Sequence, residues 1–316
     1  MAFHSIDPAN GEKIASYEEM PAVEVQQSIE QCHAAQQLWR NTSFDQRASL
    51  MLALRDRLLA NKQDHARLMS REMGKVYPQG IAEVEKCAWA CDYYADHAAD
   101  FLAPEDVDTE AQHSFIAYKP LGVVLAVMPW NFPLWQVFRF AVPALMAGNG
   151  ALLKHAPTVF GCALLIEKLF REAGFPEHLF RSLLIDIPMT TEVIHNPLVA
   201  AVTITSSVAA GRAVAAEAGR ALKKCVLELG GSDPFIVLED ADLDRAVDTG
   251  IIARFQNSGQ SCIAAKRFIV VDAVYDEFER KFVEKTAALK MGDPMQDGVY
   301  IGPLARVDLR DGLHNQ

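Results

Sequence analysis

From residue 120 onward, short apolar runs alternate with segments of helical length, and this alternation restricts the fold more than any other feature. Runs so short and apolar are typical of strands buried on both faces, and helices between them indicate repeated βαβ units. We therefore predict an α/β fold with a parallel, Rossmann-like sheet. The expected strands are VVLAV (123–127), ALLKH (151–155), SLLI (182–185), AAVTIT (200–205) and CVLEL (225–229).

The sequence before this region predicts a hairpin-like start at 5–20, helices over 22–100 and an extended segment at 103–119. After Gly230-Gly231 another α/β cycle begins. It comprises PFIVL (234–238), a helix over 242–255, RFIVV (267–271) and a helix over 274–289. The glycine pair therefore predicts a boundary between residues 1–229 and residues 230–316.

Charge and composition exclude several classes of protein. With 30 basic and 41 acidic side chains the formal net charge is -11, which disfavours nonspecific binding to nucleic acid or anionic membranes. The uncharged stretch between Lys119 and Arg139 contains three prolines, so it is not expected to span a membrane. Six dispersed cysteines indicate reduced thiols and a cytoplasmic location. Cys87 and Cys91 lack further partners, so no metal site is predicted.

A candidate nucleophile lies in NSGQSCIAAKR (257–267), where Cys262 sits on a small, polar, irregular segment of the kind that carries chemistry. A candidate base is Glu228, at the end of the strand in VLELGG. Burial between Leu227 and Leu229 would raise its pKa and suit it to proton transfer near neutral pH. The alternative is a salt-bridged glutamate at a strand end.

Two further segments have the character of ligand sites. Asn131, in the proline-stiffened turn MPWNFP, could stabilise an oxyanion, although a turn-capping asparagine is the commoner case. The segment TSSVAAG (205–211) leaves a strand and opens a helix, so its N–H groups could bind a phosphate. Alternatively, Ser206 and Ser207 serve only as helix caps.

Taken together, these segments resemble the aldehyde dehydrogenases. PWNFP, LLKHAP, VTITSSVAAG, LELGG and GQSC occur in that family's order at comparable spacing, and the resemblance runs from about residue 5 to the last residue. The residues that flank these motifs are most similar to those of bacterial succinate-semialdehyde dehydrogenases. The resemblance implies a dinucleotide-binding domain over 1–229, with 103–119 as an oligomerisation segment, and a catalytic domain over 230–316. The family's last third would follow Gln316, so we expect this catalytic domain to be incomplete.

The resemblance also implies a mechanism. Cys262 would attack an aldehyde, Asn131 and the Cys262 backbone N–H would hold the oxyanion, and Glu228 would activate the hydrolytic water. NAD or NADP would accept the hydride. The implied cofactor-binding residues are Trp130, Lys154, His155, Ala156, Pro157, Ser206, Ser207, Gly211 and Leu229. The implied substrate residues are Phe132, Trp135, Arg139, Ser261 and Ile263.

Arg139 stands where semialdehyde-oxidising members carry an arginine, so it would pair with a distal carboxylate, unless it forms only a salt bridge on a helix surface. The family's second such arginine falls at Gln256, and Ser206 replaces the glycine of the usual T-G-S. Pro157 stands where NAD-preferring members often have glutamate, so NADP should be accepted. The partners implied are a small aldehyde and further copies of the chain.

Two other functions stay open at this stage. The chain could be a catalytically incompetent module that binds nucleotide or another protein. It could also be a coenzyme-A-acylating enzyme that transfers the acyl group from Cys262 to a thiol. Glu228 disfavours this second alternative, because transfer to a thiol needs no base to activate water.

Overall fold

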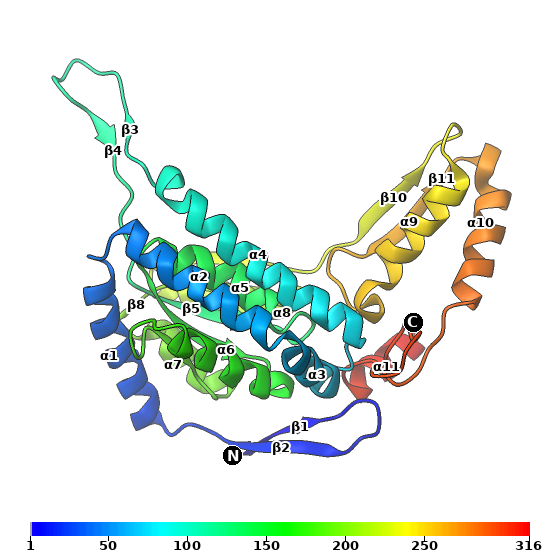
Figure 1. Ribbon diagram of the computed structural model, residues 1–316, viewed down its shortest axis with the longest axis horizontal. Coiled ribbons are helices and arrows are strands. Elements are labelled where there is room, and N and C mark those ends of the chain that lie inside the picture. Colours follow the sequence, from blue (N-terminus) through cyan, green and yellow to red (C-terminus); the bar gives the residue numbers. More distant parts are fainter. Residues whose placement is uncertain (1) are drawn as a thin grey trace.

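A five-stranded parallel sheet forms the centre of the computed structural model, which describes residues 2–316 (Figure 1). Its strand order is β7-β6-β5-β8-β9, and every neighbouring pair is parallel. The predicted α/β class is therefore confirmed. The strands are β5 (Val123–Met128), β6 (Gly150–His155), β7 (Phe180–Ser182), β8 (Val199–Thr205) and β9 (Lys224–Glu228).

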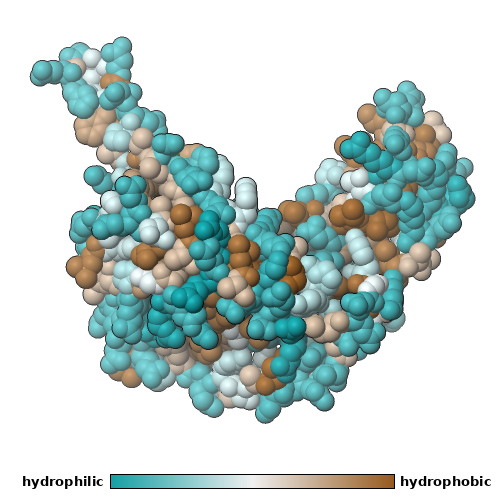
Figure 2. Space-filling model, in the orientation of Figure 1, coloured by the Kyte–Doolittle hydropathy of each residue, from teal (hydrophilic) through white to brown (hydrophobic). Residues whose placement is uncertain are grey.

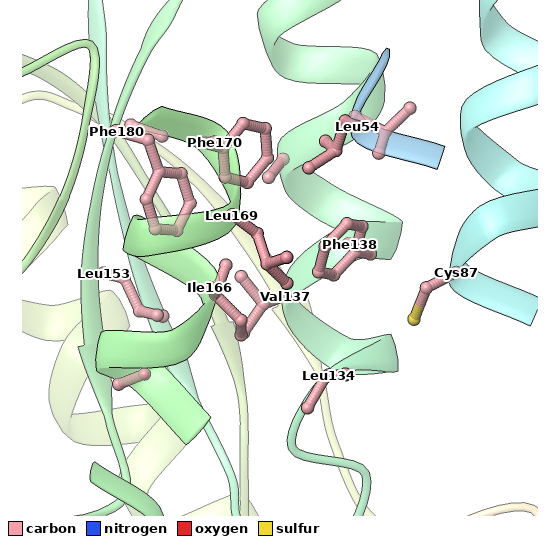
Figure 3. Packing of buried hydrophobic residues seen from close by; sticks show 14 of the residues in the cluster. Leu54, Cys87, Leu134, Val137, Phe138, Leu153, Ile166, Leu169, Phe170 and Phe180 are labelled. Atoms are coloured by element: carbon pink, nitrogen blue, oxygen red, sulfur yellow. The ribbon is translucent and has the colours of Figure 1, made fainter. Parts of the chain in front are cut away.

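Helices cover both faces of this sheet, because alternate residues of its buried strands point to opposite sides. Ala126 and Met128 of β5 join the larger core under α5 and α6, whereas Val123 and Leu125 join the core under α1, α7 and α8. Figure 3 shows Phe138, Phe170 and Phe180 packed in the larger core. The covering helices are α5 (Trp135–Met146), α6 (Phe160–Glu172), α7 (Ile187–His195) and α8 (Val208–Arg220).

The predicted helical region forms four helices. A capping box between Ser43 and Gln46 starts the second, which together with the third and fourth packs on the α5–α6 side. The four are α1 (Ala22–Trp39), α2 (Phe44–Ala60), α3 (Lys62–Met73) and α4 (Tyr77–Phe101). Because α4 packs on α5, it brings residues 77–86 beside the end of the sheet.

Two hairpins flank the body. The first, β1 (Ala2–Ile6) with β2 (Lys13–Glu18), is fixed by Glu72, whose carboxylate accepts hydrogen bonds from Ser5 Oγ and from the N–H groups that open α6. The second, β3 (Glu105–Asp106) with β4 (Phe115–Ile116), projects from the body in Figure 1. The predicted extended segment thus forms a hairpin whose tip stands clear of the body.

The chain after β9 forms a second unit with its own core. Its parallel strands β10 (Asp233–Val237) and β11 (Ala265–Val270) pack with α9 (Leu243–Phe255) and α10 (Asp272–Ala287) around Val237, Val247, Ile251 and Phe278. The predicted boundary at Gly230-Gly231 falls between β9 and β10. Figure 1 shows this unit as a separate arm, and Figure 2 shows hydrophobic residues on its surface. Three short elements remain: η1 (Pro157–Val159), η2 (Gln256–Gly259) and α11 (Val307–His314).

The structure differs from the sequence prediction at the last strand of the main sheet. We predicted β9 to be buried, but Val226 and Leu227 are exposed, because β9 is an edge strand whose outer side no described element covers. The prediction that Glu228 is buried is wrong for the same reason. Strand β7 also ends at Ser182, earlier than the predicted run, and α11 was not predicted, whereas α7 lies where helical sequence was expected between two strands. Within residues 2–316, no helix has the length and apolar character needed to cross a membrane.

Candidate active site

The turn after β5 carries Asn131, and His155 fixes that turn from the interior. The His155 ring is fully buried; its Nε2 donates to the carbonyl of Pro133 at 2.8 Å, while Nδ1 accepts from the N–H of Ala156 at 3.0 Å. Burial lowers the pKa of His155 to about 4, so the ring stays neutral near pH 7. His155 therefore positions the turn and does not line the nucleotide cleft that the resemblance assigned to it.

A buried ion pair fixes the same turn from the side of α4. Glu83 Oε1 accepts hydrogen bonds from the N–H groups of Leu134 and Trp135, each at 2.9 Å, and its other oxygen bonds the ammonium of Lys75. That ammonium lies 4.0 Å from the ring centroid of Phe132. The carboxylate thus satisfies N–H groups at the start of α5, where the helix dipole favours a negative charge.

The segment before Cys262 has an unusual backbone. Asn257 and Ser258 have φ angles of 56° and 55°, in the left-handed region that side chains other than glycine rarely occupy. Gln79 accepts a hydrogen bond from the Asn257 N–H at 2.8 Å, and the Asn257 side chain donates to the carbonyl of Asn131 at 2.7 Å. The loop is therefore tied both to α4 and to the turn after β5.

The last part of the chain ties down the same loop. Ser258 Oγ accepts from the N–H of Gly302 at 2.9 Å, and Gln260 Oε1 accepts from the N–H of Ala305 at 3.0 Å. The Asn131 amide in turn donates to the carbonyl of Gln260 at 2.9 Å. An asparagine amide has two N–H donors, so one remains for another acceptor. Asn131 and the cysteine loop are thus brought together from positions far apart in the sequence.

Cys262 lies where two cavities meet. A cleft of about 740 Å³ opens at the carboxyl ends of β5, β6 and β8, and a chamber of about 260 Å³ lies between α4, α5 and the cysteine loop. Of the residues that the structure describes, only Cys262 and Gln136 line both. The other five cysteines line neither cavity. The geometry therefore singles out Cys262 as the thiol that can act on contents of both spaces.

Most residues that we predicted to bind the nucleotide line the larger cleft, at the strand ends where such sheets bind ligands. These are Trp130, Lys154, Ala156, Pro157, Ser206, Ser207 and Leu229. Ser207 is also the N-cap of α8, accepting from the Ala210 N–H. Gly211 lies outside the lining. A Cβ there would come within 2.4 Å of Leu229 Cδ2, so the glycine is what allows Leu229 to pack against α8.

The cleft suits an anionic, hydroxyl-bearing ligand such as a dinucleotide. Lys154 is buried, and burial lowers its pKa against a smaller opposing effect of Asp186, yet its ammonium has no hydrogen bond or salt bridge with any residue of the described chain. Such a group needs a polar partner. The N–H groups in the first turn of α8 lack intrahelical acceptors and could meet phosphate oxygens. The cleft also contains residues that no motif indicated: Ile187, Thr190, Thr191, Ile194, Val214, Glu217, Arg306 and Leu309.

All five residues that we predicted to contact substrate line the smaller chamber: Phe132, Trp135, Arg139, Ser261 and Ile263. Gln256, where the resemblance places a second arginine, lines it as well. The sequence analysis missed the contribution of α4, which supplies Gln79, Ala82, Glu83 and Lys86, and of the neighbouring Lys75. Their helical spacing indicates one shared face of α4, but nothing in the sequence shows what that face contacts.

Glu228 lies apart from both linings. Its side chain is 56% exposed, and its carboxylate is 3.7 Å from Arg139 Nη1, while Arg139 Nη2 donates to Thr205 Oγ1 at 3.1 Å. The salt bridge that the sequence analysis gave as the alternative role of Glu228 and of Arg139 is therefore present. The pair is long and solvent-exposed, so it is worth at most about 1 kcal/mol and leaves both side chains able to move.

A parallel α/β sheet, a cleft fit for a dinucleotide and a cysteine beside a second chamber are together typical of a nucleotide-dependent enzyme with a thiol nucleophile. The chain belongs to the aldehyde dehydrogenase family, whose model matches residues 1–316. It is thus an oxidoreductase of that family, as its motifs predicted. No group of three or more potential metal ligands occurs among residues 2–316.

Individual relatives agree with this assignment. The chain is 49% identical over 312 residues to the succinate semialdehyde dehydrogenase [NAD(P)+] Sad of Escherichia coli K12, covering 99% of this chain and 68% of that protein. It is 51% identical over 309 residues to a probable succinate-semialdehyde dehydrogenase [NADP(+)] of Synechocystis, covering 98% and 68%. The solved Streptococcus pyogenes succinic semialdehyde dehydrogenase with NADP+ superposes with a TM-score of 0.97 at 33% identity, covering 99% and 69%.

Proposed function

We propose that the protein catalyses the NAD(P)-dependent oxidation of a short semialdehyde, succinic semialdehyde in the first place, to the carboxylate. The observation that carries this proposal is the position of Cys262 at the junction of the nucleotide cleft and the chamber. The names of the relatives in Escherichia coli and Synechocystis support the choice of substrate. Arg139, which lines the chamber, supports a substrate with a distal carboxylate.

In this mechanism the Cys262 thiolate attacks the aldehyde carbon, and the carbonyl oxygen becomes an oxyanion. The Asn131 amide and the Cys262 backbone N–H donate to that oxyanion. NAD or NADP, when bound in the cleft, would supply the acceptor for the hydride that the substrate carbon loses, and an acyl group would remain on the sulfur. A water molecule then attacks the thioester, Glu228 takes its proton, and the carboxylate product leaves as the thiolate is restored.

Glu228 must move to act as this base, because its carboxylate faces Arg139 and it lines neither cavity. The weak pairing described above allows such movement. The coenzyme-A-acylating alternative would not need it. Product analysis separates the two: free succinate formed without coenzyme A supports hydrolysis, and an acyl thioester formed only with coenzyme A supports transfer.

The cleft also bears on the choice of nucleotide. Lys154 and Pro157 both line it, and the lining has no carboxylate at position 157 to repel a 2′-phosphate. We therefore propose that NADP is accepted as well as NAD. Titration of the protein with each nucleotide tests this point without requiring turnover.

The decisive experiment measures NAD(P)H formation from succinic semialdehyde by the wild type, Cys262→Ala and Cys225→Ala. Cys225 is half-buried and lines neither cavity, so its variant is the matched control. We expect loss of activity only in Cys262→Ala. Unchanged activity in that variant would refute the mechanism, and nucleotide binding without turnover in the wild type would support the incompetent nucleotide-binding module.

A further inference from the structure

The charges around the chamber are unevenly compensated. Lys75 and Glu83 neutralise each other in a buried pair, and Arg139 faces Glu228 only loosely at 3.7 Å. Lys86 is the remaining charged residue of the lining, and no carboxylate within the described chain pairs with it. Gln256 adds no charge. The lining therefore carries an excess of positive charge, which is suited to an anionic group.

The ammonium of Lys86 is held in place without an acidic partner. It lies 4.1 Å from the ring centroid of Trp135, a cation–π contact. Trp135 and Arg139 are four residues apart on α5, so they are neighbours on one helix face. The contact with Trp135 thus holds Lys86 beside a residue one helical turn from Arg139, and an anion can approach Lys86 without displacing a carboxylate from it.

Lys86 is exposed at the chamber, at a distance from the cysteine loop that suits the tail of a short substrate. Gln79, Glu83 and Lys86 share one face of α4; Gln79 contacts the cysteine loop, whereas Lys86 contacts Trp135 on α5. Seven residues of helix separate them, about 10 Å along the axis. The lysine is therefore remote from the cysteine loop, at the end where the tail of a substrate bound to Cys262 would lie.

We propose that Lys86 is a second anchor for the distal carboxylate of the substrate, acting with Arg139 and held for this role by Trp135. This inference deepens the proposed function and rests on it. The carboxylate would take the place of Glu228 beside Arg139 and would accept a hydrogen bond from the Lys86 ammonium. An uncharged aldehyde would gain nothing from Lys86, so the residue would set specificity and leave the chemical step unchanged.

Steady-state kinetics of Lys86→Met test the inference, since methionine keeps most of the length of the side chain and removes its charge. Because Lys86 is exposed, we expect KM for succinic semialdehyde to rise roughly threefold to fivefold, the upper range of a solvent-exposed ion pair. KM for butanal and kcat for both substrates should change less than about twofold, and Lys86→Arg should restore most of the loss. Lys168→Met, an exposed lysine on α6, is the matched control. Equal changes with both aldehydes, or no change, would overturn the inference.

A second measurement does not depend on turnover. Iodoacetamide should alkylate Cys262, a free cysteine that is partly exposed; butyrate, which carries the carboxylate but no aldehyde, should protect the thiol, whereas butanol should not. The butyrate concentration that halves the alkylation rate should rise in Lys86→Met and stay unchanged in Lys168→Met. Equal protection in all three proteins, or none in the wild type, would contradict a carboxylate site at Lys86. Protection as expected in a protein that turns over no aldehyde would refute the proposed function alone.

Discussion

Neutralising Glu83 should destabilise the protein far more than its position on a long helix suggests. In Glu83→Gln the amide oxygen can still accept from the N–H groups of Leu134 and Trp135, but the amide nitrogen then faces the ammonium of Lys75. Removing one partner of a buried pair costs about 3–5 kcal/mol, because the other charge is left unpaired. Loss of the Lys75 proton would limit this cost, since burial already lowers the pKa of that lysine.

Urea unfolding of a double-mutant cycle measures the effect. Lys75→Met in the Glu83→Gln background removes the unpaired charge and should recover most of the lost stability, which gives a coupling of roughly 2–4 kcal/mol. Glu85→Gln is the matched control, because Glu85 lies on the surface of α4, the helix whose buried side carries Glu83, and pairs with Lys62 of α3; this change should cost less than about 1 kcal/mol. Additivity of the two Glu83 and Lys75 changes within about 0.5 kcal/mol would refute the reasoning.

Two further predictions concern the turn and the cleft. His155 has a folded-state pKa of about 4 against 6.5 for free histidine, so its contribution to stability is complete above pH 6.5 and is lost as the pH falls toward 4. Over that range the free energy of unfolding of the wild type should fall by about 3 kcal/mol more than that of His155→Gln, as measured by urea unfolding at several pH values. Parallel pH profiles of the two proteins would contradict this. Gly211→Ala should push Leu229 into the cleft and weaken NADP binding about tenfold in a titration. Gly219→Ala, on the same helix with open space around its Cβ, should leave binding unchanged, and equal affinities in both variants would exclude the mechanism.

The sequence predicted the order of strands and helices along the chain well, because the apolar composition of β5, β6 and β8 by itself indicates strands buried on both faces. It failed at β9. Val226 and Leu227 are as apolar as residues of β5, and only the elements covering a sheet edge decide whether such residues are buried. That information is tertiary, so the expectation for Glu228 failed with it.

The same limit applies to the site. The motifs led to Cys262 and Asn131, and the structure brings the two segments into contact through Gln260. They also led to His155, because the sequence LLKHAP does not show whether the ring faces the cleft or the turn. Lys86 belongs to no motif, since its proposed role depends on how α4 packs against α5. Packing between distant segments thus decides which polar residues reach a ligand.

The left-handed backbone at Asn257 and Ser258 has a consequence for the order of events in folding. Such conformations cost about 1–3 kcal/mol each and persist only where surrounding contacts maintain them. Here the contacts come from α4, from the turn after β5 and from residues 302–305, which are separated by long stretches of chain. The cysteine loop should therefore reach its native backbone conformation only after all three segments have assembled, so that protection of the buried Asn257 N–H from hydrogen exchange during refolding reports the completion of the native state.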